Sequence, residues 1–360
     1  REPFWRKVPS PLPKPHPSLS QDFCVYRILV RGLASVRAAF AVRRITQWES
    51  VVRGKRACGC PAPLRKTAMS TPFARGPLLI LLGALCFSTT GTVQALSPEG
   101  ATPYVIGALR MLVGGLALLL WCAFQGELPR FWRWPMRCVV PSTLALLGFQ
   151  FFFFRGVLEA GVAVGTVVAI GFSPIVVALL GLIFLREKPA KAWYPATGLA
   201  LIGLILLNAD AVGGASFAGM AFPLLAGFSY ACYFVFSKPL AQNAAPGSVM
   251  MVLCLLSGLC MLPVFWIYPA AWLATPVGAL VALHLGVVTT AIAFSLTLAG
   301  LKVTPAATAS TLSLAEPLSA ACLGIFFLHE PLSLSAAVGI ALIFGSVLIL
   351  VACPVRTASP

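Results

Sequence analysis

The chain has 360 residues, of which 59% are hydrophobic and 10% are charged. Ordinary soluble domains are about 25% charged, so a soluble fold of this composition would have too few polar side chains to cover its apolar surface. The composition therefore predicts an integral membrane protein, and the formal net charge of +16 does not indicate nucleic-acid binding, because most of the excess lies in one segment.

Residues 1–68 form that segment. They hold 14 of the 26 Lys and Arg residues and 3 of the 10 Asp and Glu residues, with many prolines and no apolar run of spanning length. We expect a basic, Pro- and Arg-rich extension that lacks a packed core. One interpretation is that Met69 is the true start and that the extension is not translated. A transit peptide and a tail that binds anionic headgroups are the alternatives.

The rest of the chain contains ten apolar runs separated by short loops with Pro, Gly or charged residues. Runs of about 20 apolar residues are long enough to cross a bilayer as helices. The fifth run is the shortest. We therefore expect an all-α polytopic membrane protein with ten transmembrane helices. The predicted spans are 77–96, 102–124, 139–157, 162–185, 191–208, 216–236, 247–268, 276–298, 304–328 and 332–352.

One segment occurs twice, 143 residues apart. PIVVALLGLIFLRE begins at Pro174, PLSAACLGIFFLHE begins at Pro317, and seven of the fourteen aligned positions are identical. This offset carries five predicted helices onto the next five, so we expect two repeats, 69–210 and 211–353, followed by a short tail at 354–360. Because five is odd, the repeats must insert with opposite orientation, which places the substrate site near the bilayer midplane.

The distribution of Lys and Arg predicts the orientation in the membrane. If the helices alternate from an inside start, ten basic residues lie on one side and only Arg155 lies on the other, while Arg110 falls within a span. Such a bias marks the cytoplasmic side of a membrane protein. We expect both termini, including the 354–360 tail, in the cytoplasm.

The order and spacing of these motifs resemble the EamA family of the drug/metabolite transporter superfamily over Met69–Cys353. The resemblance implies a ten-helix carrier of the bacterial inner membrane, most often an exporter of amino acids or related small metabolites, without an ATPase domain. Members with similar motifs carry different compounds, so it does not specify the substrate. The matching segments are GALCFSTTG, IGALRMLVGG and SPIVVALLGLIFLREKP in the first half, and GVVTTAIAFSLTLAG and VTPAATASTLSLAEPLSAACLGIFFLHEPLS in the second.

Two charged residues, Arg110 and Glu316, lie well inside predicted spans, where a charge is costly unless it faces a cavity or a partner. Arg110 lies about 12 Å into the second helix at 1.5 Å per residue, either as an anion site or as a structural residue satisfied by carbonyls. Glu316 is the only acid well inside a predicted span. Burial disfavours the charged form of a carboxyl group, so Glu316 could take up and release a proton and is a candidate proton carrier. A permanent pair with Arg110 and a solvated position are the alternatives. The counterpart of Glu316 in the first repeat is Ser173.

Further candidates for the site come from the same helices. Pro174 and Pro317 each free a backbone carbonyl and allow a kink, and matched breaks in two halves point to a central site. Tyr230 and Tyr233 could reach the cavity with their hydroxyl groups. His284 is a minor candidate, because a lone His in an apolar helix is more often packed and hydrogen-bonded than a proton relay.

Glu187 and Glu330 end the two copies of the repeated segment, and for both we expect an interfacial position with loop or capping contacts. The eleven Cys residues show no metal-ligand spacing, so we predict no metal and no cofactor.

These features favour a secondary-active transporter of a small molecule, coupled to a proton gradient and present in the bilayer as a monomer or homodimer, with no nucleic-acid partner. A membrane enzyme would need a cluster of catalytic groups such as HExxH, but only one His and one acid lie well inside the spans. No GxxxxGK[ST] phosphate loop of a primary pump occurs in these residues. A channel or facilitator for small solutes is the main alternative.

Overall fold

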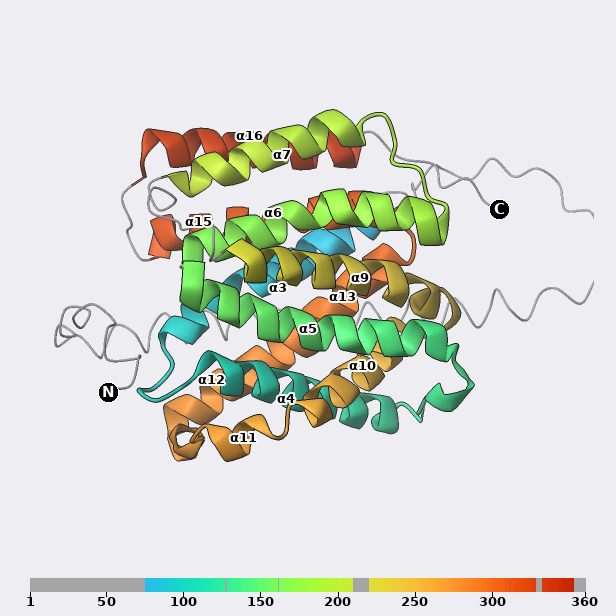
Figure 1. Cartoon of the computed structure of the whole chain (residues 1–360), viewed down its shortest axis with the longest axis vertical. Coiled ribbons are helices and arrows are strands. Elements are labelled where there is room, and N and C mark those ends of the chain that lie inside the picture. The colour runs from blue at the N-terminus through green and yellow to red at the C-terminus, as the bar shows by residue number, and fades with distance from the viewer. Residues whose placement is uncertain (1–74, 127, 161, 210–219, 328–331, 353–360) are drawn as a thin grey trace, which may run out of the picture. The chain divides into compact units, whose positions relative to one another are not determined.

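The computed structural model describes residues 75–126, 128–160, 162–209, 220–327 and 332–352. Every regular element in these ranges is a helix, and none is a strand (Figure 1). The predicted all-α fold is therefore confirmed. The predicted extension at 1–68 and the tail at 354–360 lie outside the described residues, as does Glu330.

The described helices follow the predicted spans. Nine helical spans are long and apolar enough to cross a membrane, and a tenth, α7, is shorter at 15 residues, as expected for the fifth span. The first five are α3 (Arg75–Ala95), α4 (Pro103–Phe124), α5 (Met136–Ala160), α6 (Val162–Leu180) and α7 (Trp193–Leu207). The second five are α9 (Ala221–Asn243), α10 (Pro246–Cys260) with α11 (Val264–Ile267), α12 (Pro276–Gly286) with α13 (Ala293–Leu301), α14 (Ala306–Leu312) with α15 (Ala315–Phe327), and α16 (Leu334–Ala352).

Two equivalent contacts between α4 and α10 relate the repeats. A Cβ on Gly115 would lie 2.8 Å from the Leu255 side chain, and a Cβ on Gly258 would lie 2.8 Å from the Leu112 side chain. Adding 143 to Leu112 and Gly115 gives Leu255 and Gly258, so each repeat makes the same contact with the other. The small residue at each crossing lets the helices approach closely. Such reciprocity is the mark of a two-fold axis.

The same relation holds between whole helices. The pairing of α5 with α9 in the third and sixth spans corresponds to the pairing of α13 with α3 in the eighth and first, while α7 packs on α16. Because each repeat contributes an odd number of spans, the two repeats have opposite orientation, and the axis lies in the membrane plane.

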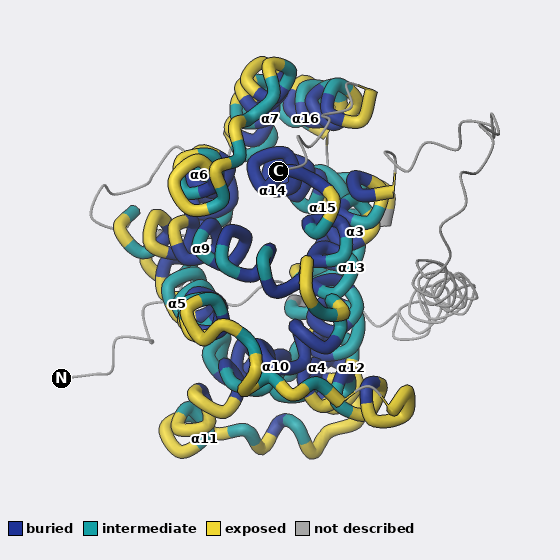
Figure 2. Tube along the Cα trace, turned by 90° about the vertical axis from the view of Figure 1, so that its right-hand side faces the viewer, coloured by how far each residue is buried: buried dark blue, intermediate teal, exposed yellow. Residues whose placement is uncertain are grey.

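Within the helical part of the chain, the α7–α16 pair lies at one edge and α4, α10 and α12 lie toward the other (Figure 1). Buried stretches follow the inner side of this bundle, and exposed stretches follow the outer side (Figure 2). Large apolar side chains on the outer side, such as Leu120, Phe124 and Phe326, are mostly exposed. This arrangement fits helices whose outer faces contact lipid rather than water.

The end of α9 differs from the prediction. The span was expected to end at residue 236, with Lys238 in a loop, but α9 continues to Asn243 and Lys238 is only 2% exposed. The sequence Ser-Lys-Pro resembles a loop, because Pro usually ends a helix. Here α9 continues through Pro239, and a carboxylate compensates the buried lysine charge, as described below.

The two repeated prolines do not mark matched helix breaks. Pro174 lies inside α6, which continues through it, whereas the ninth span is broken at residues 313–314, before Pro317. Pro317 is the third residue of α15, a position in the first helical turn where the missing N–H is tolerated. Among the residues that the structure describes, only the second repeat therefore has a helix broken at this position.

Candidate functional site

Arg110 is held by one π-helical turn of the eighth span. Its Nε donates to Thr290 Oγ1 at 3.1 Å, and its Nη2 donates to the Thr289 carbonyl at 3.2 Å. Both threonines lie in η7 (Val287–Ile292), which joins α12 to α13. π-helical turns are rare and are frequent at functional sites. The side chain of Arg110 thus crosses from the first repeat to the second.

The Arg110 guanidinium keeps unused donors. It is 8% exposed and has five N–H groups, but the hydrogen bonds found among the described residues use only two of them. Positions 143 residues away from Arg110, Thr289 and Thr290 are all leucine. This polar contact between the repeats therefore has no counterpart at the positions that the two-fold relation pairs with it.

Glu316 lies at the start of α15, directly after the break in the ninth span. Its backbone N–H donates to the Ser313 carbonyl at 3.0 Å, and its side chain is half-buried. The carboxylate is close enough to Arg110 and to Tyr230 for its charge to act on both. No ion pair within 4 Å and no hydrogen bond joins Glu316 to Arg110 in the described structure. The two charges thus lie near each other without forming an ion pair.

The aromatic residues of α9 form a wall beside this pair. The rings of Tyr230 and Tyr233 are stacked, with centroids 6.2 Å apart, and Tyr230 also lies 5.2 Å from Phe149. Tyr233 is fully buried, and its hydroxyl group donates to Met250 Sδ at 3.3 Å. Of the two candidates, Tyr230 is the one beside Glu316, while the Tyr233 hydroxyl is used against α10.

His284 lies on α12 and faces α3. Its Nε2 is 3.0 Å from Thr89 Oγ1, and Thr89 donates to the Cys86 carbonyl at 2.8 Å. Because the Thr89 hydrogen is used, the Thr89 oxygen accepts from His284. The geometry is that of a packed, hydrogen-bonded histidine.

Ser173 and Pro174 lie on α6 and are both buried. Ser173 Oγ donates to the Ile170 carbonyl at 2.9 Å and lies 3.4 Å from Ser310 Oγ on α14. The structure thus brings Arg110, Glu316 and Tyr230 into one region, while Ser173 contacts the half-helix that precedes Glu316.

Thr289 and Thr290 were missed as site residues in the sequence. The only available signal was the pair of adjacent hydroxyl residues in an otherwise apolar segment, GVVTTAIAF. Threonine hydroxyls in membrane helices usually bond their own backbone, as both do here to the Leu285 carbonyl. That they also hold Arg110 depends on packing between the repeats.

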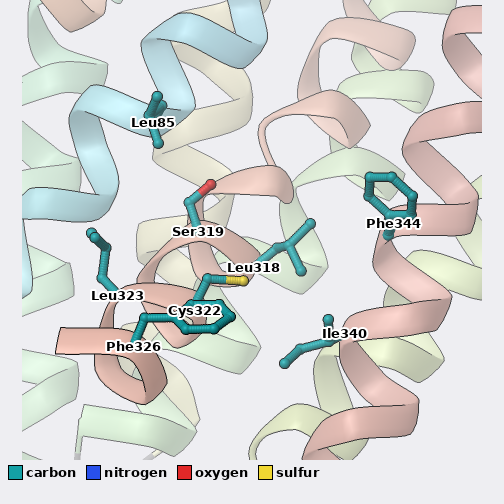
Figure 3. A pocket seen from close by; sticks show the side chains of 8 residues that line it. All are labelled: Leu85, Leu318, Ser319, Cys322, Leu323, Phe326, Ile340 and Phe344. Carbon is teal, nitrogen blue, oxygen red and sulfur yellow. The ribbon is translucent and has the colours of Figure 1, made fainter. Parts of the chain in front are cut away.

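A cavity of about 370 Å³ lies between α3, α15 and α16 (Figure 3), and neither Arg110, Glu316 nor Tyr230 lines it. Its lining is apolar except for Ser319 and Cys322, so it offers no charge to a hydrophilic solute. The lining residues are Leu85, Leu318, Ser319, Cys322, Leu323, Phe326, Ile340 and Phe344. Among the described residues, no group of three or more His, Cys, Asp or Glu side chains could hold a metal ion.

Two helical repeats with opposite orientation and a polar site at their interface define an integral membrane transporter. The chain belongs to the EamA-like transporter family, whose sequence profile matches residues 74–209 and 217–352. The family resemblance noted in the sequence is thereby confirmed.

Several proteins that are similar to this chain carry names that describe them as transporters or exporters. The chain is 40% identical over 279 residues to the "uncharacterized transporter YwfM" of Bacillus subtilis, which covers 77% of this chain and 94% of that protein. It is 29% identical over 272 residues to the threonine/homoserine exporter RhtA of Escherichia coli K12, covering 71% and 85%. A solved crystal structure with 22% identity has a TM-score of 0.68 and covers 76% of this chain and 95% of that one, which supports the fold.

Proposed function

We propose that this transporter is a secondary-active exporter of amino acids or related small metabolites, driven by a proton gradient. The observation that carries the proposal is the separated pair of Arg110 and Glu316, which come from opposite repeats and act on each other without an ion pair. Arginine binds carboxylates with two parallel hydrogen bonds, and a carboxylate binds an ammonium group. A zwitterionic amino acid matches both.

The proton coupling is assigned to Glu316. When Glu316 is ionised, it binds the substrate amine, and when it is protonated, it releases that amine. Competition of a proton and an amine for one carboxylate exchanges one for the other across the membrane. The break before α15 places this carboxylate at a helix start, where the helix dipole favours the ionised form and where discontinuous helices of transporters form their sites.

Tyr230 contributes a wall on which an apolar or cationic part of the substrate rests. An aromatic face attracts a cation within about 6 Å, so the ring supports the amine beside Glu316. The relatives that are named threonine/homoserine exporters support amino acids as the first substrates to test.

The remaining features of the proposal follow from the charge distribution and the family. We assign the protein to the bacterial inner membrane with both termini in the cytoplasm, as a monomer or homodimer that needs no cofactor, has no nucleic-acid partner and catalyses no chemical reaction. The Lys and Arg bias among the loops supports this orientation.

Reconstitution into proteoliposomes tests the function. Labelled threonine, homoserine and a panel of other amino acids and amines are offered with and without an imposed pH gradient. We expect saturable uptake of at least one amino acid that the gradient accelerates, and counter-flow of label against excess unlabelled solute. Non-saturable flux without counter-flow would identify a channel, and no flux of any amino acid or amine would reject the proposed substrate class.

A further inference from the structure

A second pair of charges joins the repeats where α6 and α9 end and α14 begins. Lys238 Nζ contacts Glu187 Oε1 at 2.5 Å and donates to the Thr304 carbonyl at 2.7 Å. Glu187 Oε2 accepts from the Ala306 N–H at 2.9 Å and so caps the start of α14. We call these four residues the Glu187 cluster. Its carboxylate comes from the first repeat, and its other members come from the second.

The local backbone holds Glu187 in place. The fourth span ends in a π-helical turn, η4 (Gly181–Leu185), and Arg186 adopts a left-handed conformation with φ 56°. The Glu187 N–H then donates back to the Gly181 carbonyl at 3.1 Å. This turn directs the carboxylate toward α14 instead of into a loop.

The Glu187 cluster borders a narrow crevice between the end of α6 and the start of α14. This crevice is too narrow to hold a water molecule and is lined by Val177, Ala178, Gly181, Glu187, Lys188, Pro189, Pro305 and Ala307. The Lys238 side chain is 3% exposed, against 28% for that of Glu187. The buried ammonium of Lys238 uses two of its three N–H donors on one carboxylate and one carbonyl, so it joins α9 to the end of the fourth span and to the start of the ninth.

Residues of the first repeat also hold α14, although α14 belongs to the second. The Trp193 indole N–H lies 2.9 Å from Thr311 Oγ1 and 3.1 Å from the Ala307 carbonyl, and Thr197 Oγ1 is 2.9 Å from Thr311 Oγ1. Every residue of α14 is buried. The short helix is therefore attached to α6 and α7, and the turn at 313–314 separates it from α15 and Glu316.

The first repeat lacks an equivalent lysine. The position 143 residues before Lys238 is Ala95, and the neighbouring residues 94–97 are uncharged. Lys238 thus has no counterpart in the first repeat, so the ion pair departs from the two-fold relation.

We propose that the Glu187–Lys238 pair is a latch that must open for the central site to communicate with the side of the bundle where α6 and α9 end. In transporters with inverted repeats, access alternates as one half moves against the other. Such movement separates Glu187 from Lys238 and frees the start of α14. This proposal depends on the proposed transport cycle, because the latch has a function only if access to the site alternates. It does not depend on which substrate is carried.

Hydrogen–deuterium exchange of the full chain in lipid nanodiscs tests the latch without any transport assay. The variant Lys238→Met removes the charge and keeps the side-chain length, while Glu187 can still cap Ala306. The double variant Glu187→Gln/Lys238→Met leaves neither charge unpaired, so it avoids the misfolding that an isolated buried charge causes. Glu159→Gln is the control, because Glu159 pairs with Arg155 on the same helix at a more exposed position.

Loss of a charge-assisted contact should raise local opening by about tenfold or more. We expect such an increase in exchange for residues 304–312 in both latch variants, no change in α4 and α10, and wild-type exchange in Glu159→Gln. Unchanged exchange at 304–312 in the folded double variant would overturn the latch. A uniform increase over all helices would also overturn it, because that result identifies a general stabilising contact. Since no substrate is used, failure of the proposed transport would leave this result unaffected.

Discussion

In the described part of the chain, two pairs of opposite charges bring together residues of both repeats, and the pairs differ in what the charges contact. Glu187 and Lys238 touch, and each makes a further backbone contact. Arg110 and Glu316 act on each other without touching, and three N–H groups of Arg110 have no partner among the described residues. Charges that satisfy each other stabilise one arrangement of the helices, whereas charges kept apart remain available to a ligand.

The largest effect is expected from Glu316→Gln, which removes the charge and keeps the shape. If Glu316 carries the proton and holds the amine, the variant should lose gradient-driven transport in proteoliposomes and retain exchange of labelled solute only with a raised KM, because glutamine mimics the protonated form that releases the amine. The contrast between the two charge pairs also predicts that Glu316→Gln folds normally, because Arg110 forms no ion pair with Glu316. A poorly folded or poorly inserted variant would instead indicate a structural partner of Arg110, and a folded variant with unchanged gradient-driven transport would remove Glu316 from the coupling.

The variant Arg110→Lys tests whether Arg110 binds the substrate carboxylate. Lysine keeps the positive charge but lacks the planar fork that binds a carboxylate with two hydrogen bonds. We expect the KM for the transported amino acid to rise about tenfold, the cost of roughly one charged hydrogen bond, with the protein still folded. Measurement of KM and of the maximal rate separates these effects. Equal KM values for wild type and Arg110→Lys would mean that Arg110 does not hold the substrate.

The two-fold relation itself predicts a matched pair of stability effects. Gly115→Val and Gly258→Val add the same bulk at equivalent crossings of α4 and α10, and overpacking of this kind costs about 1–3 kcal/mol. We expect nearly equal falls in Tm for the two detergent-solubilised variants. Gly198→Ala is the control, since no atom lies within 4 Å of its added Cβ. Clearly unequal shifts would show that the crossings are not equivalent in energy.

The sequence was enough to predict the helices, because the apolar run lengths and the 143-residue repeat are local or periodic signals. It also indicated Arg110 and Glu316, since charged residues are rare in apolar spans. It could not show that Lys238 is buried against Glu187, because Ser-Lys-Pro has the composition of a loop and the partner lies 51 residues earlier in the chain. Nor could it locate the helix break before Pro317, which depends on the packing of α14 between the repeats.

The smallest effect is expected at His284, which tests whether a hydrogen-bonded polar residue outside the separated pair takes part in coupling. Glutamine cannot titrate but retains an N–H that can donate to Thr89, so His284→Gln should preserve the contact between α12 and α3. We expect gradient-driven transport close to that of wild type and a stability change within about 1 kcal/mol, the size of one neutral hydrogen bond. The paired variant Thr89→Val removes the acceptor and should lower Tm slightly more. If His284→Gln instead abolishes gradient-driven transport while solute exchange continues, the proton pathway includes α12, and Glu316 is not the sole coupling group.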